Sequence, residues 1–236
     1  MKYSKKYTEK LKLVDRVKRY DLDSALELVK KGATAKFDET LGLAIKLAID
    51  LKKLGGSVRG TVILPGGSGK TKKVAVIAKG AAAAEAEKAG ADIVGEQDLI
   101  ARIEKGFFGF DVLLTTPDMM VAVAKLGKTL GTKGLMPNPK TGTVTPDIAK
   151  AVAEFKAGKL EFKADKTGVI NVGLGKLSFP LANLKKNVTA VVGAVLKAKP
   201  ANAKGDYIKS MTLSSTMGPG VKLDFKKYIA ETGSEK

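Results

Sequence analysis

The sequence predicts an α/β protein of two domains, in which a Rossmann-like three-layer α/β unit is inserted into an α+β domain built from both chain ends. The uneven distribution of charge along the chain supports this division. Residues 1–60 carry 15 basic and 8 acidic side chains, residues 61–160 carry 14 and 10, and residues 161–236 carry 13 and 6. The spacing of apolar residues also differs between the middle and the ends. We therefore expect a discontinuous domain at 1–67 and 159–236, and an inserted domain at 68–158.

In the middle of the chain, short apolar strands alternate with helices. This alternation is typical of a parallel sheet that is covered by helices on both faces. Gly90 and Gly106 follow the first two helices, and Pro117 occupies the first position of the third, as such residues often do. The expected strands are 74–78, 93–94 and 111–116, and the expected helices are 81–89, 96–105 and about 117–126.

The terminal regions show strands and helices without that alternation. From Phe37 to Ile49 apolar residues fall on odd positions, a period of two that predicts a half-buried strand. Pro180 opens a long helix whose apolar residues recur at helical spacing, ending before Pro200. The other expected elements are a helix at 21–31 and strands at 58–64, 160–162, 169–174, 207–215 and 221–225.

The composition excludes several classes of function. The 236 residues include 42 Lys and Arg against 24 Asp and Glu, a net charge of +18, and neither Cys nor His. Disulfides, thiol nucleophiles, imidazole bases and Cys- or His-ligated metals are therefore excluded, and we expect no cofactor and no enzyme activity. No apolar run approaches the roughly 20 residues of a membrane span. Because no apolar stretch follows the first basic residues, we expect no secretory signal. We expect a cytoplasmic protein with a polyanionic partner, nucleic acid before an anionic membrane surface.

Residues 64–71 end in Gly-Lys-Thr, as a phosphate-binding loop does. Leu64 stands where that motif requires its first glycine, and the chain continues into a strand where a phosphate loop would open a helix. We interpret the segment as a Gly-rich crossing between the domains. The alternative function is a nucleotide-dependent enzyme on the middle domain, which lacks a Gly-x-Gly-x-x-Gly motif after residues 74–78.

The segment 134–144 is rich in Pro and Gly, which predicts a rigid loop that cannot be helical. It is either a structural connection between helices or a stiff basic surface for a phosphate backbone. Lys140 lies within the segment, and Lys133 directly precedes it. The composition does not separate the two alternatives.

Four other segments, all in the strongly charged terminal regions, combine Lys with hydroxyl side chains or glycine. Each has a structural alternative, since Phe37 would ordinarily belong to the core and the segment after Ser214 would be a Gly-Pro turn. As RNA contacts, Phe37 would pack on a ribose or base, Lys36 would bind phosphate, and hydroxyls and glycine N–H groups would approach the backbone. The segments are 34–40, 163–168, 175–179 and 214–220.

Six blocks in this order carry a resemblance to a known family: ATAKFDET (33–40), VRGTVILP (58–65), GLMPNPKTGTVT (134–145), DKTG (165–168), GKLSF (175–179) and SSTMGPG (214–220). They resemble the bacterial family of large-subunit ribosomal protein one, the mobile-stalk protein beside the tRNA exit site. The resemblance covers about residues 15–224. It implies a monomer within the ribosome that binds a large-subunit rRNA stalk, acts on deacylated tRNA at the exit site and represses its own operon through a leader mRNA.

Two departures accompany the resemblance, since Gly66 and Asn171 stand where the family often has His. Only four of the 42 basic residues are Arg, and Lys binds phosphate as a point charge, which favours recognition of backbone and shape over base sequence. Whether the middle domain contacts tRNA through Lys133 and Lys140 is left open. By motif, the resemblance assigns rRNA contacts to Lys36, Phe37, Thr40, Lys166, Thr167, Lys176, Ser178, Ser210, Thr216, Met217 and Gly218.

Overall fold

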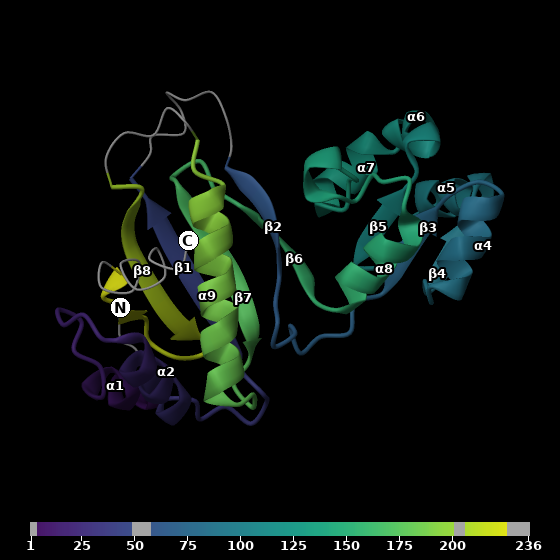
Figure 1. Cartoon of the computed structure of the whole chain (residues 1–236). Coiled ribbons are helices and arrows are strands. Elements are labelled where there is room, and N and C mark those ends of the chain that lie inside the picture. The colour runs from purple at the N-terminus through teal and green to yellow at the C-terminus, as the bar shows by residue number, and fades with distance from the viewer. Residues whose placement is uncertain (1–3, 49–57, 201–205, 226–236) are drawn as a thin grey trace. The chain divides into compact units, whose positions relative to one another are not determined.

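The computed structural model describes residues 4–48, 58–200 and 206–225. Its mixture of helices and sheets confirms the predicted α/β class (Figure 1). By their contacts the residues divide into two compact units, which we call the terminal unit (Met1–Gly69 with Phe162–Lys236) and the middle unit (Lys70–Glu161).

A four-stranded antiparallel sheet forms the centre of the terminal unit. Its strand order is β7-β1-β8-β9, and Leu43 of β1 lies opposite both Val172 of β7 and Leu213 of β8. The last strand is shorter than predicted. The strands are β1 (Thr40–Leu47), β7 (Val169–Lys176), β8 (Ile208–Ser215) and β9 (Val221–Lys222).

Helices α2 (Leu22–Lys31) and α9 (Leu181–Lys197) cover one face of this sheet (Figure 1). The odd positions of β1 point into this core and are at most 3% exposed, whereas Gly42, Ala44 and Lys46 on the other face are accessible. The predicted period of two is confirmed over β1, which begins three residues after Phe37; Ile49 lies outside the described residues.

Two further pieces complete the description of the terminal unit. Strand β2 (Arg59–Ile63) pairs in a two-stranded sheet with β6 (Lys159–Lys163), of which only the last two residues belong to this unit. Helix α1 (Lys5–Lys12) was not predicted, because it has no stripe of buried apolar residues. Among its described side chains only that of Lys10 is buried.

The middle unit contains a parallel sheet of order β4-β3-β5, with both faces covered by helices. Alternate residues of β3 point to opposite sides. Ala75 and Ile77 pack with apolar residues of α5, α6 and α7, whereas Val74 and Val76 pack with those of α4 and α8. The elements are β3 (Val74–Ile77), β4 (Ile93–Gly95), β5 (Val112–Thr115), α4 (Ala81–Lys88), α5 (Gln97–Glu104), η1 (Pro117–Met119), α6 (Met120–Ala124), α7 (Gly127–Lys133) and α8 (Ile148–Lys156).

The Pro-rich segment 134–144 is partly helical, so the prediction that it cannot be helical is wrong. Pro139–Thr141 form one 3₁₀ turn, η2. Proline is compatible with the first position of such a turn because no hydrogen bond requires its missing N–H there. The Asn138 side-chain oxygen accepts from the Lys140 N–H at 2.9 Å, and the Asn138 N–H donates to Thr143 Oγ1 at 2.7 Å. These contacts hold the loop to itself and leave the Lys140 side chain exposed.

Residues 64–71 open no helix and run directly toward β3, as predicted. A buried side chain of α9, Asn187, holds the start of this segment. Its Oδ1 accepts from the Gly66 N–H at 2.8 Å, and its Nδ2 donates to the carbonyl oxygens of Gly67 at 3.1 Å and Leu174 at 2.7 Å. The side chain thus satisfies three backbone groups of two segments at once.

We expect Asn187→Ala to destabilise the protein. The residue is fully buried, and its removal leaves buried backbone donors and acceptors unpaired, which lowers the free energy of unfolding by about 2–3 kcal/mol. Urea denaturation measures this change. Asn183→Ala, one turn earlier on α9 and partly exposed, is the matched control and should shift stability by less than about 0.5 kcal/mol. Equal effects of the two substitutions would contradict this role for Asn187.

Candidate nucleic-acid interface

Three segments that are distant in sequence meet at one end of the four-stranded sheet. Thr40 begins β1 and lies opposite Lys176 at the end of β7, while Leu41 lies opposite Ser215 at the end of β8. The loop before β1, the turn after β7 and the turn after β8 therefore lie at the same place, which we call the loop end. Eight predicted RNA contacts belong to it: Lys36, Phe37, Thr40, Lys176, Ser178, Thr216, Met217 and Gly218.

The structure does not bring the other three predicted contacts to this end. Lys46 of β1 lies opposite both Val169 and Ser210, so Ser210 and the turn containing Lys166 and Thr167 lie toward the other end of the sheet. From Ser210 of β8 to Thr216, directly after the strand, the chain advances by six residues, about 20 Å at the usual rise of a strand. A ligand that contacts both ends must extend along the sheet.

The face of the sheet that no described helix covers, which we call the uncovered face, joins the two ends. Apart from Ser214, its residues were not among the candidate contacts predicted from the sequence. The sequence pattern could have identified them, because they are the polar or small residues that alternate with core positions in each strand. Most are short side chains, which leave the backbone accessible on a low surface. They are Gly42, Ala44 and Lys46 of β1, Asn171 and Gly173 of β7, and Thr212 and Ser214 of β8.

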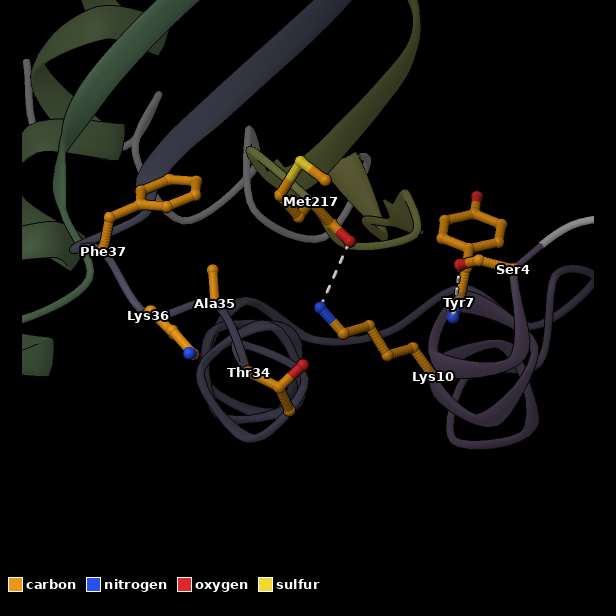
Figure 2. Close-up of a pocket in the computed structure, with 8 residues that line it drawn as sticks. All are labelled: Ser4, Tyr7, Lys10, Thr34, Ala35, Lys36, Phe37 and Met217. Atoms are coloured by element: carbon orange, nitrogen blue, oxygen red, sulfur yellow. Dashed lines mark hydrogen bonds between the residues drawn. The ribbon is translucent and has the colours of Figure 1, made fainter.

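Two large apolar side chains are exposed at the loop end. Phe37 is 55% exposed and Met217 is 57% exposed, and both line a hollow together with Lys36 and residues of α1 (Figure 2). The structural alternative for Phe37, a place in the core, is therefore wrong. Exposed apolar side chains grouped beside basic ones are typical of a binding surface.

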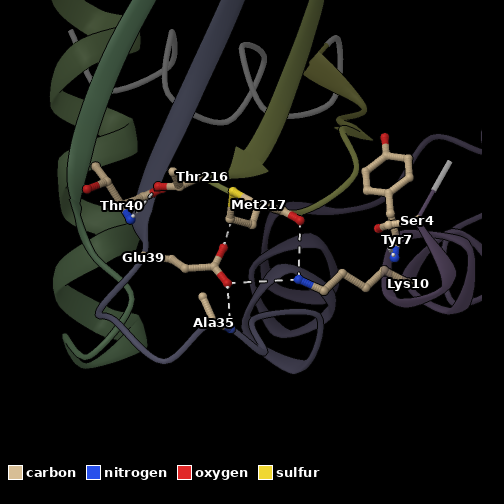
Figure 3. A network of polar contacts seen from close by, with 8 residues as sticks. All are labelled: Ser4, Tyr7, Lys10, Ala35, Glu39, Thr40, Thr216 and Met217. Carbon is tan, nitrogen blue, oxygen red and sulfur yellow. Dashed lines mark hydrogen bonds and ion pairs between the residues drawn. The ribbon is translucent and has the colours of Figure 1, made fainter.

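A buried carboxylate holds the turn after β8 against the loop before β1 (Figure 3). Glu39 is only 2% exposed. Its Oε2 accepts from the Met217 N–H at 3.0 Å, and its Oε1 accepts from the Ala35 N–H at 3.2 Å. Lys10 of α1 adds a positive charge 3.9 Å from Oε1, and its Nζ donates to the Met217 carbonyl at 3.2 Å. Three segments are thus joined through one side chain.

The surroundings of Glu39 lower its pKa below the ordinary value of 4.5. Burial alone acts in the opposite direction, because it penalises the charged form. The neighbouring Ser215 hydroxyl, the N–H groups of Met217 and Ala35, and the charge of Lys10 outweigh that penalty. The carboxylate is therefore charged at neutral pH, which is the state that can accept these hydrogen bonds.

Several predicted contact residues also hold the loop end together. The Thr40 N–H donates to Thr216 Oγ1 at 3.0 Å. Lys176 Nζ donates to the Asp38 carbonyl at 2.8 Å, and Ser178 Oγ donates to Asp38 Oδ2 at 2.7 Å. These side chains fix the shape of the surface, and their exposed hydroxyl and ammonium groups have further hydrogen-bonding capacity.

Lys133 and Lys140 belong to the middle unit, and both are exposed. Lys133 closes α7, and its Nζ lies 3.8 Å from the centre of the Phe108 ring, a cation–π contact. Lys140 lies on η2. Both lysines therefore lie at the surface of this unit, one at the end of α7 and one on η2.

The chemistry available at the loop end is that of binding. It offers ammonium groups, hydroxyls and backbone N–H groups, which suit phosphates and sugars. Across the described ranges no three acidic side chains gather as a metal site would require. No helix of the described residues has the length and apolar character needed to cross a membrane.

We expect acid to weaken the Glu39 contacts. Because its pKa is lower in the folded state, its contribution to stability is complete above pH 4.5 and is lost as the pH falls through that value and past the lower folded pKa. Glu39→Gln should lose about 1–3 kcal/mol at pH 7, and this difference from the unchanged protein should shrink below pH 4.5. Urea denaturation across this pH range measures it, with exposed Glu27→Gln as control. A difference that stays constant with pH would contradict this role of the carboxylate.

A family model, that of the ribosomal protein L1p/L10e family, matches residues 29–219. The match covers most of the chain and includes β1, β7 and β8, the strands that meet at the loop end, whereas α1 lies outside it. The chain therefore belongs to this family, whose members are structural, RNA-binding proteins of the large ribosomal subunit rather than enzymes. Membership places it on the cytoplasmic ribosome with rRNA as its partner.

Proposed function

We propose that the terminal unit binds a helical stalk of the large-subunit rRNA, with the loop end of its sheet as the centre of the contact. The observation that carries this proposal is the meeting of segments 34–40 and 216–218, which places exposed Lys36, Phe37 and Met217 on one preformed surface. Both segments are rich in the backbone and side-chain groups that contact RNA without reading its bases.

The proposed contact has a phosphate part and an apolar part. Lys36 pairs with a phosphate, while hydroxyls and N–H groups of the turn after β8 reach ribose and phosphate oxygens. Phe37 and Met217 exclude water from these polar contacts by packing on a sugar or base. Because lysine makes no bidentate fork, the unit recognises the contour of the folded RNA more than its sequence.

The uncovered sheet face provides the route to the more distant residues. Ser210, Lys166 and Thr167 contact the same RNA only if it extends from the loop end along β8 and β1. Gly42, which has no side chain, and the short side chains of Ala44 and Thr212 allow close approach there. We propose that they form the outer part of the interface.

Two finer functions are part of the proposal. The protein assists the release of deacylated tRNA at the exit site, and it represses its own operon by binding a leader mRNA that mimics the rRNA site. The mRNA would occupy the loop end in place of rRNA. The tRNA would meet the middle unit, where Lys133 and Lys140 are exposed.

We expect Met217→Asp to weaken binding of the rRNA stalk by roughly tenfold or more, since an acidic group would face phosphates across a desolvated contact. The loss should be equal for the leader mRNA. Binding of both RNAs should also weaken steeply with salt, because counterions are released when lysines meet phosphates. Filter binding at several salt concentrations measures these effects. Val121→Asp, which adds the same charge at an exposed apolar position of the middle unit, should leave both affinities unchanged.

The opposite pattern would refute the interface. If crosslinks between protein and rRNA map only to the middle unit, or if affinity is flat from low to physiological salt, the terminal unit does not bind as proposed.

We expect the double substitution Lys133→Ala, Lys140→Ala to weaken binding of deacylated tRNA to ribosomes that carry the protein. Loss of two phosphate contacts should also reduce the salt dependence of tRNA binding. The affinity of the protein for the rRNA stalk should not change. Lys150→Ala, an exposed lysine of α8 in the same unit, is the control. Unaltered tRNA binding would show that these two lysines do not face tRNA.

A further inference from the structure

A hollow of about 720 Å³ lies beside the loop end, between α1 and the loop before β1 (Figure 2). Its volume is within the range of sites that hold small organic molecules. Tyr7 of α1 lies on one side and Phe37 on the other, with Met217 between them and Lys10 below it. Lys36 and Thr34 add polar groups to its wall.

The hollow combines flat apolar walls with polar groups, which restricts its occupant. Two aromatic rings and a thioether favour a planar ring that can stack. The ammonium of Lys36 and the hydroxyl of Thr34 favour an occupant with polar edges and a nearby negative charge. A free phosphate would make no use of the apolar walls, and a purely apolar ligand would leave the polar groups uncompensated. A nucleobase on its sugar-phosphate backbone has all of the required features.

The shape of the hollow is maintained by the contacts already described. Lys10 Nζ donates to the Met217 carbonyl, and Glu39 accepts from the Met217 N–H. Both backbone polar groups of Met217 are therefore hydrogen-bonded, while its side chain stays exposed. Helix α1 supplies Tyr7 and Lys10 and lies outside the residues that the family model matches.

We propose that this hollow receives one unpaired, unstacked base of the bound RNA, with Tyr7 as a stacking wall contributed by α1. The inference rests on the proposed function, since the RNA backbone at the loop end must bring the base within reach. It adds a contact by which the protein selects RNA with an extruded base at this place. A continuous duplex would leave the hollow unfilled.

The test uses the full chain and rRNA extracted from large ribosomal subunits. Tyr7→Ala should weaken binding by roughly tenfold, the usual effect of removing one base-stacking ring, and Tyr7→Phe should bind like the unchanged protein. The slope of affinity against salt should be the same in Tyr7→Ala, because no phosphate contact is lost. Lys36→Ala should instead reduce that slope by about one. Val17→Ala, at an exposed apolar position outside the hollow, is the control, and thermal melting verifies that each variant is folded.

A second measurement locates the base directly. Ultraviolet irradiation of the complex links bases to side chains that touch them, and we expect a nucleotide on the peptide that carries Tyr7 or on the one that carries Phe37. The proposal is overturned if Tyr7→Ala binds normally and neither peptide is linked, or if Tyr7→Phe loses as much affinity as Tyr7→Ala. If binding is then still salt-dependent and is still weakened by Met217→Asp, the proposed function stands. If the unchanged protein does not bind this rRNA, both proposals fail.

Discussion

The buried carboxylate of Glu39 joins the loop before β1, the turn after β8 and helix α1, and the geometry of the candidate interface depends on it. Each of its oxygens accepts a backbone N–H, and Lys10 compensates its charge. A buried carboxylate is stable only when such partners surround it. The segments that provide these partners are therefore held in one arrangement, and Met217 remains exposed between them.

For the proposed interface, this arrangement matters because the surface does not need RNA in order to form. Ordering flexible loops during association reduces affinity, whereas a preformed surface avoids most of that loss. Contacts such as those of Thr40 with Thr216 and of Ser178 with Asp38 have this effect at the loop end. Some residues that motif comparison assigns to RNA contact thus also act on the protein itself, and their substitution would alter both.

The two faces of the four-stranded sheet differ in their surroundings. One side packs against α2 and α9, where the odd positions of β1 exclude water. No helix among the described residues covers the other side, which carries short or polar side chains. A half-buried sheet of this kind combines a stable core with a broad accessible surface, which is consistent with a family of structural RNA-binding proteins.

Local pattern was sufficient to predict most strands, together with helices α2 and α9, because burial of one face repeats every second residue in a strand and every third or fourth in a helix. It failed for α1, whose buried side chain is a lysine, and for η2, where proline is tolerated at a first helical position. Helices α7 and α8 of the middle unit were not predicted either. Only the tertiary structure decided that Phe37 is exposed and that Glu39 meets Met217, which is 178 residues away in the chain. The reason is physical: periodicity records which face of an element is buried, whereas the meeting of distant segments depends on how β1 pairs with β7 and β8.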